Sequence, residues 1–269
     1  MFYTKKLIQQ NYFMKHNYDS VDMLKETCST NSTKQKEASY TVKERAWLSF
    51  IPVFLMLFSF VFVQSQTTLI SPTGDGGFEN GATFAANGWQ VINPATDTWQ
   101  VGNVPVSSNG ARCAYISANG GAAWTYSQFS VFNHMYKDIT IPAGENKVTL
   151  SFKWKVGGEG TTTSDWDNLK VFLSPTSFTP TATAAVSGAR QLIGPGATSG
   201  MYKLSSASWN AETIVFSAAP GTYRLIFQWK SDGLDIANPP AALDEISLTS
   251  QAPGNFISVA NGNWTNPAT

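Results

Sequence analysis

Apolar residues recur at every second position in two stretches of this 269-residue chain, KVTLSFKWKV at residues 147–156 and TYRLIFQWK at residues 222–230. The alternation is strict in the first stretch and is interrupted only by Ile226 in the second. Because a strand points successive side chains to opposite faces, this period indicates half-buried antiparallel strands. Each stretch also follows an apolar run and a Pro/Gly turn, ITIPAGEN or IVFSAAPG, which suggests equivalent strand pairs within one sandwich.

Shorter apolar runs predict five more strands, separated by loops rich in glycine, serine, threonine and asparagine. No helical period of useful length appears after residue 66. Many short strands without helices are typical of sandwiches, so we expect an all-β fold, a jelly-roll β-sandwich of two antiparallel sheets, over residues 66–251. The shorter runs are residues 88–93, 113–117, 169–174, 213–217 and 243–249.

The segments that flank residues 66–251 differ from it in character. Residues 46–63, AWLSFIPVFLMLFSFVFV, follow a basic stretch and lead into QSQTT, so residues 46–65 are interpreted as an export signal peptide. An uncleaved membrane anchor is the alternative, because the length borders on that of a membrane span. Residues 1–45 are interpreted as a disordered extension or a mis-assigned start, and residues 252–269 as a linker and the start of a truncated further module.

Composition narrows the functional class. Charged residues make up 13% of the chain, about half the share typical of soluble domains. Residues 66–269 hold 13 acidic and 10 basic side chains, so no basic face is available and nucleic-acid binding is not expected. The two cysteines, Cys28 and Cys113, stand on opposite sides of the apolar segment, which excludes a disulfide framework in a cleaved product. The profile favours a secreted or cell-surface β-protein.

Acidic residues occur near both ends of the expected sandwich. GDGGFENG, residues 74–81, carries Asp75 and Glu79, and LDEISLTS, residues 243–250, carries Asp244. The period of two places Asp244 on the same face as Ile246 and Leu248, which is the expected core face. A buried carboxylate must take up a proton, accept several hydrogen bonds or pair with a cation.

Calcium is the cation that these residue types favour. It binds carboxylate and backbone carbonyl oxygens, and glycine-rich loops can turn such carbonyls toward an ion. GDGGFENG does not have the spacing of a helix-loop-helix calcium site. The residues alone therefore leave an alternative open, in which Asp75 lies in a turn, Glu79 is solvated and Asp244 caps the end of a strand.

Several short motifs resemble one family of modules. FENG with Trp89 ten residues after Glu79, GARCAYIS, LSFKW, YRLIFQW, Trp209 before TIVF, and LDEISL are similar to the cleaved-adhesin and MAM-like jelly-roll modules of surface and secreted bacterial proteins, across residues 70–250. The resemblance, which extends to carbohydrate-binding jelly rolls, implies a structural calcium held by Glu79 and Asp244. Asp75 is added from its charge alone. The MAM cysteines are absent, which favours the adhesin-like branch.

Aromatic residues in the expected loops are candidates for ligand binding. Trp99, Trp124, Tyr126 and Trp166 could stack on sugar rings. Partial burial against the strands is the alternative for all four. The remaining tryptophans of the domain, Trp89, Trp154, Trp209 and Trp229, are expected in the core.

The sequence contains no convincing set of catalytic residues. Asp165 and Asp167 could form a carboxylate pair for glycoside hydrolysis, but acidic residues two apart in a loop more often form a solvated turn or contribute to a metal loop. His134 has no GxSxG-type nucleophile elbow to serve, and Cys113 is expected to be a small buried apolar residue. The chain is not expected to be an enzyme.

The sequence therefore predicts a non-catalytic secreted or cell-surface module for adhesion or ligand binding, stabilised by calcium. Its expected partner is a glycan or an extracellular or surface protein, with membrane contact only if residues 46–63 stay uncleaved. Two alternatives remain open. The module could be the accessory domain of a larger exported peptidase or glycoside hydrolase, or a structural spacer between surface repeats.

Overall fold

The structure is a computed structural model that describes residues 65–254. The predicted N-terminal extension, the apolar segment at residues 46–63 and most of the predicted C-terminal linker lie outside the described residues. Within them, no helix has the length and apolar character needed to cross a membrane.

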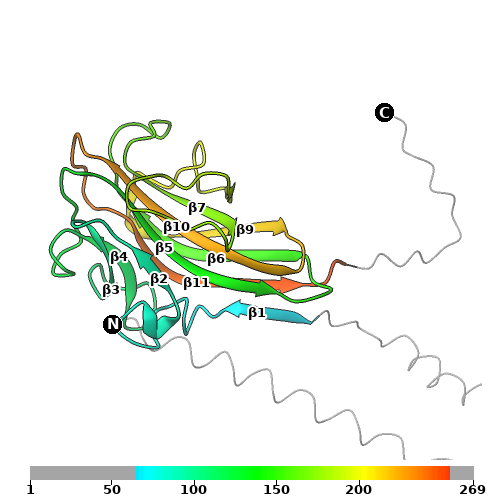
Figure 1. The fold of residues 1–269 in the computed structure, drawn as a ribbon. Coiled ribbons are helices and arrows are strands. Elements are labelled where there is room, and N and C mark those ends of the chain that lie inside the picture. The colour runs from blue at the N-terminus through cyan, green and yellow to red at the C-terminus, as the bar shows by residue number, and fades with distance from the viewer. Residues whose placement is uncertain (1–64, 255–269) are drawn as a thin grey trace, which may run out of the picture. The chain divides into compact units, whose positions relative to one another are not determined.

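Two antiparallel sheets pack face to face, as Figure 1 shows. The predicted jelly-roll β-sandwich is confirmed. The larger sheet has the order β3-β4-β11-β6-β9, with β1 also paired to β11, and the smaller sheet has the order β2-β5-β10-β7-β8. The larger sheet consists of β1 (Gln66–Ile70), β3 (Thr98–Gly102), β4 (Cys113–Ser117), β6 (Lys147–Val156), β9 (Ser205–Ser217) and β11 (Ala242–Gln251). The smaller consists of β2 (Gln90–Ile92), β5 (Ser130–Ile141), β7 (Asn168–Pro175), β8 (Arg190–Gln191) and β10 (Gly221–Asp232), and a short 3-10 helix, η1 (Ala85–Asn87), precedes β2.

The two alternating stretches form β6 and β10, which lie in opposite sheets. Their apolar residues face each other across the core, where the rings of Phe152 and Phe227 meet edge to face at 5.4 Å. Trp229 of β10 is fully buried. Burying a side chain of this size contributes about 2–3 kcal/mol, so these paired faces are a principal source of stability. Each predicted strand–turn–strand unit connects one sheet to the other rather than forming a hairpin within one sheet.

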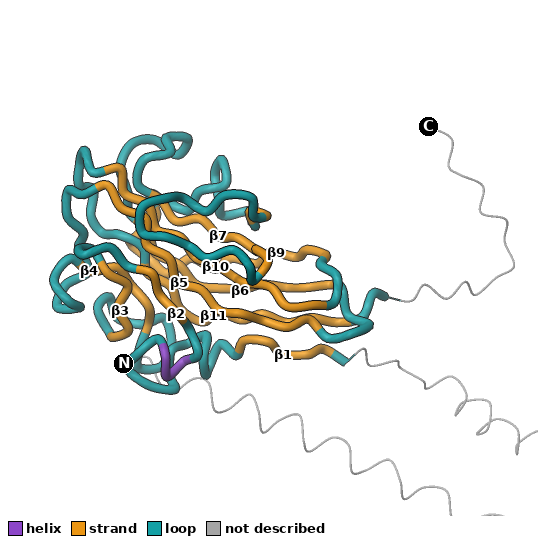
Figure 2. The backbone as a smooth tube through the Cα atoms, viewed as in Figure 1, coloured by secondary structure: helices purple, strands orange, loops and turns teal. Residues whose placement is uncertain are grey.

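The outer face of the smaller sheet is covered by the segment between β7 and β8. Tyr136, Phe172 and Ile226 pack there against Phe178 and Val186. Figure 2 shows this teal segment crossing the sheet. Beneath it lies the fully buried His134, whose Nε2 is 3.3 Å from Oε1 of Gln228. The same oxygen accepts the backbone N–H of Val186 at 2.7 Å, which ties the covering segment to the sheet.

A bulge in β11 corrects one sequence prediction. The pairing register with β6 shifts between Asp244 and Ser247, and Glu245 has a φ of 47°. The bulge places Leu243, Ile246 and Leu248 together in the main core. Asp244 is fully buried, as predicted, but the predicted face is wrong. It lies on the outer side of the larger sheet, because the bulge breaks the period of two on which the prediction rested.

His134 makes the stability of the sandwich depend on pH. Burial lowers the pKa of His134 from 6.5 to about 4, so the folded state keeps it neutral while the unfolded chain is protonated below pH 6.5. The free energy of unfolding should therefore fall as the pH drops from about 6.5 to about 4, by about 3 kcal/mol from this residue. Urea unfolding across this range checks the prediction. His134→Gln, which cannot titrate, should lack this component, and parallel pH profiles for the two proteins would contradict it.

Candidate functional site

The opening loop of the domain meets the last strand directly. The backbone N–H of Ile246 donates a hydrogen bond of 2.9 Å to the carbonyl of Gly76. A Cβ at position 76 would lie 1.7 Å from the carbonyl oxygen of Ile246, so only glycine permits this approach. The two acidic stretches singled out in the sequence are therefore neighbours in the fold.

Glu79 and Asp244 contact the same loop, residues 103–112, from different elements. Oε1 of Glu79 accepts the backbone N–H groups of Ala111 at 2.8 Å and Arg112 at 2.9 Å. Oδ2 of Asp244 accepts those of Ser108 at 2.7 Å and Asn109 at 3.3 Å. The two carboxylates thus hold the loop against the start of β11.

Asp75 does not join them. Its carboxylate lies 3.0 Å from Nζ of Lys137 and accepts the backbone N–H of Ser71 at 2.7 Å. Within residues 65–254, the predicted metal trio of Asp75, Glu79 and Asp244 is not a group whose carboxylate oxygens all lie within 4.8 Å of one another.

Burial of the Asp244 side chain disfavours its charged form. Burial raises the pKa of Asp244 to about 6, although three backbone N–H bonds, from Glu245, Asn109 and Ser108, oppose the shift. Among the described residues no ion pair forms at its carboxylate. The Asp244 carboxylate thus accepts hydrogen bonds from the loop, but these bonds do not fully offset the cost of burying its charge.

The four predicted ligand-binding aromatics are placed very differently. Trp99 lies on β3 rather than in a loop, and both Trp99 and Tyr126 are buried in the main core, so their expected exposure is wrong. Trp124 is half-buried against the small cluster of Cys113, Tyr115 and Ala242. Trp166, in contrast, is 46% exposed. The four residues therefore do not form one platform.

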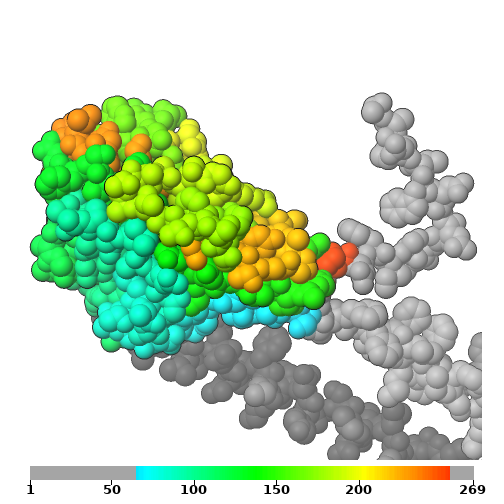
Figure 3. Space-filling view, in the orientation of Figure 1, coloured from blue at the N-terminus to red at the C-terminus, as the bar shows by residue number. Residues whose placement is uncertain are grey.

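Three loops at one end of the sandwich are bonded to one another. They are residues 118–129 before β5, 157–167 before β7 and 233–241 after β10. Gly157 N–H donates to Pro239 O at 2.8 Å, and Tyr126 N–H donates to Oδ1 of Asn238 at 3.0 Å. A Cβ on Gly157 would lie 2.5 Å from the carbonyl oxygen of Pro239, so this junction also requires glycine. We call these loops the loop end. Figure 3 shows its orange segment, residues 233 to 238, among green loops at the upper left.

Exposed apolar side chains are concentrated at the loop end. The pairing of Ser130 with Asp232 and of Asn168 with Lys230 puts the start of β5, the end of β10 and the start of β7 side by side. The residues next to these ends include four of the large apolar side chains that remain exposed: Phe129 (55%), Trp166 (46%), Leu234 (69%) and Ile236 (45%). Such a group on a protein surface is typical of a binding site.

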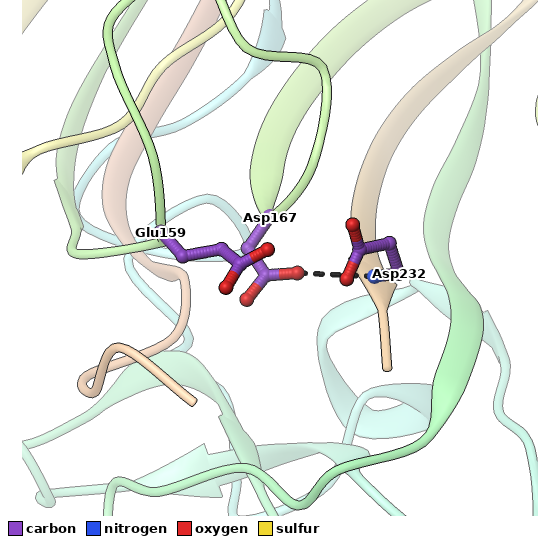
Figure 4. Close-up of side chains that lie close together, drawn as sticks. All are labelled: Glu159, Asp167 and Asp232. Carbon is purple, nitrogen blue, oxygen red and sulfur yellow. Dashed lines mark hydrogen bonds between the residues drawn. The ribbon is translucent and has the colours of Figure 1, made fainter. Parts of the chain in front are cut away.

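Three carboxylates converge within the same loops, as Figure 4 shows. One oxygen each of Glu159, Asp167 and Asp232 lies within 4.8 Å of the others. Asp167 is fully buried, and it accepts the hydroxyl of Tyr126 and the backbone N–H of Asp232, the latter at 3.0 Å. Burial raises the pKa of Asp167, and the nearby charge of Asp232 adds to the shift. Burial and the charges of Asp232 and Asp167 raise the pKa of Glu159 in the same direction.

Sequence reasoning identified only part of this second cluster. Asp167 was recognised as a possible contributor to a metal loop, but as a partner of Asp165. The structure separates the pair: Asp165 is exposed and lies 2.9 Å from Nζ of Lys170, whereas Asp167 turns inward. Nothing in the sequence joins Glu159 to Asp232, because only the pairing of β7 with β10 brings them together.

A scan against protein-family models finds no match, and the search of curated proteins likewise returns none. Among solved structures, the chain is similar to the CBM22-1 xylan-binding domain of Xyn10C from Paenibacillus barcinonensis, with 15% identity, a TM-score of 0.43, and coverage of 71% of this chain and 99% of that one. It is also similar to the cleaved adhesin domain of Lys-gingipain from Porphyromonas gingivalis, with 17% identity, a TM-score of 0.36, and coverage of 71% and 99%. A third is TmCBM61 in complex with beta-1,4-galactotriose, with 12% identity, a TM-score of 0.37, and coverage of 66% and 97%. Similarity this distant does not show what the chain binds.

Removing the Asp244 carboxylate should detach the loop at residues 103–112. Asp244→Ala leaves the N–H groups of Ser108, Asn109 and Glu245 without their buried acceptor, so the free energy of unfolding should fall by about 3 kcal/mol. Chemical denaturation in a chelator measures this effect apart from any metal. The adjacent Glu245→Gln keeps an acceptor for the Ser108 hydroxyl and should cost less than about 1 kcal/mol. Equal losses in the two variants would refute the assignment.

Proposed function

We propose that this chain is a non-catalytic glycan-binding or adhesion module of a secreted or cell-surface protein, stabilised by calcium. The observation that carries the proposal is the exposure of Trp166 at the loop end. Its ring packs on Gly160, where a Cβ would lie 2.4 Å from the ring. A fixed, half-exposed indole offers a flat apolar face that suits the face of a sugar ring.

The surroundings of Trp166 fit ligand binding. Phe129 and Leu234 are also exposed at the loop end. Phe129 directly precedes Ser130, which pairs with Asp232, and Leu234 follows Asp232 by two residues. The loops that carry them are connected by the Tyr126 and Gly157 contacts, so little freedom would be lost when a ligand binds. This arrangement supports the loop end as the binding surface, with Trp166 taken from the four aromatics that the sequence suggested.

Calcium is proposed between Glu79 and Asp244. Both carboxylates contact the loop at residues 103–112, which also has backbone carbonyls, and oxygen donors of these two kinds are those that calcium prefers. A bound cation would compensate the buried charge of Asp244. Asp75 is left out of the site, because its carboxylate is paired with Lys137 at 3.0 Å, a closer contact than the 3.9 Å between Oε2 of Glu79 and Nη1 of Arg112.

The side chains considered for catalysis have structural partners, which supports a binding role. His134 is buried against Gln228, Cys113 is fully buried, and burial raises the pKa of its thiol. Asp165 is paired with Lys170 and Lys230. Export rests on the apolar segment at residues 46–63, which belongs to the undescribed part of the chain.

Trp166→Ala should weaken glycan binding about 5- to 30-fold, because loss of a stacked indole removes about 1–2 kcal/mol of binding free energy. A glycan array and a panel of matrix proteins identify the ligand for the unmodified protein, and calorimetry then compares the variants. Val215→Ala, which shortens an exposed apolar residue of β9, is the matched control and should bind normally. Unchanged affinity in Trp166→Ala would remove the loop end as the binding surface.

Calcium should raise the melting temperature, because an ion that binds only the folded state stabilises it by mass action. Thermal unfolding of the full chain with calcium and with chelator tests this prediction. In Glu79→Gln the increase should be smaller than in the unmodified protein. Asp75→Asn should keep the full increase, since Asp75 is outside the proposed site. An equal increase in Glu79→Gln and the unmodified protein would contradict calcium between Glu79 and Asp244.

A further inference from the structure

The carboxylate cluster at the loop end is separate from Glu79 and Asp244. Glu159 precedes β7 by a loop, Asp167 directly precedes it and Asp232 ends β10, so Asp167 and Asp232 stand at the same end of two neighbouring inner strands of the smaller sheet. Asp244 belongs to β11 of the larger sheet. The two groups share no residue and no loop.

The spacing of the three carboxylates suits calcium. An ion about 2.4 Å from each of its oxygen ligands holds oxygens that are at most about 4.8 Å apart. The oxygens of Glu159, Asp167 and Asp232 all lie within 4.8 Å of one another.

Positive charge compensates the cluster only in part. Lys203 is the nearby cation, and its charge opposes the rise in the pKa of Glu159, but its Nζ donates to the backbone carbonyls of Glu159 and Ser164. None of the three carboxylates forms an ion pair with it or with another basic residue among those described. Negative charges so close together repel one another, most strongly at the fully buried Asp167.

A buried hydroxyl provides a second, independent indication of a ligand. Ser231 is fully buried, and its Oγ makes no hydrogen bond of ordinary length and angle. This hydroxyl is near enough to the Asp167 carboxylate to lower the pKa of that group, so it lies beside the cluster. Buried hydroxyls without a well-formed hydrogen bond are costly, and an oxygen beside the Asp167 carboxylate is a further hard donor for a cation.

We propose that Glu159, Asp167 and Asp232, with the Ser231 hydroxyl beside them, form a calcium site at the loop end. The ion ties the loop at residues 157–167 to the end of β10. Since Trp166 packs on Gly160, the residue after Glu159, the ion also fixes the position of the exposed indole. The site does not require the glycan-binding function or the calcium between Glu79 and Asp244.

Calorimetric titration of the full chain with calcium alone tests the site. Glu159→Gln is the main variant, because no hydrogen bond or ion pair of its carboxylate is lost and the fold should persist. It should bind one calcium ion fewer than the unmodified protein or bind that ion at least tenfold more weakly. Asp232→Asn should behave in the same way. The matched control is Asp165→Asn, an exposed carboxylate in the same loop, which should bind as the unmodified protein does.

The Glu79→Gln background separates the two calcium proposals. In that background, Glu159→Gln should abolish the remaining calcium binding, whereas Asp165→Asn should not. If the unmodified protein binds one ion and Glu159→Gln alone removes it, the loop-end site stands and the site between Glu79 and Asp244 fails. Calcium binding that is identical in the unmodified protein, Glu159→Gln and Asp232→Asn would overturn the loop-end site.

Discussion

Two fully buried carboxylates organise the irregular parts of this sandwich. Asp244 receives the N–H groups of Ser108 and Asn109, and Asp167 receives the Tyr126 hydroxyl and the N–H of Asp232. At Asp244 the backbone donors of a loop are bonded to a carboxylate of a strand, and at Asp167 a tyrosine hydroxyl and the last N–H of β10 are bonded to a carboxylate of a loop. The sheets provide the apolar core, but these two acids determine where the long loops lie.

The same acids connect stability to function. Burial disfavours the charged form of a carboxylate, and a hard cation is one way to compensate that charge. At the loop end, Asp167 stands next to the exposed Trp166 in the chain. The proposed binding surface and the proposed ion thus belong to one set of loops. The other acid, Asp244, contacts the loop at residues 103–112 on the larger sheet and holds that loop to β11.

The sequence predicted the sheets far better than the loops. β4 and β6 were located at their observed bounds, because five or more residues of clear strand pattern stand between turn signals. β3 was missed, and Trp99 was therefore assigned to a loop. The face of Asp244 was wrong because a bulge at Glu245, which has no sequence signature, shifts the register. The Glu159–Asp232 association depends on the pairing of strands far apart in the sequence, so no local pattern could reveal it.

Amide hydrogen exchange, resolved by residue, tests the central role of the buried carboxylates most directly. The N–H groups of Ser108 and Asp232 lie outside ordinary strand pairing or at its end, yet each donates to a buried carboxylate. We predict that both exchange slowly, at rates close to those of amides within β6 and β10. Exchange as fast as that of unbonded loop amides would contradict the account, because the carboxylates would then not be holding the loops.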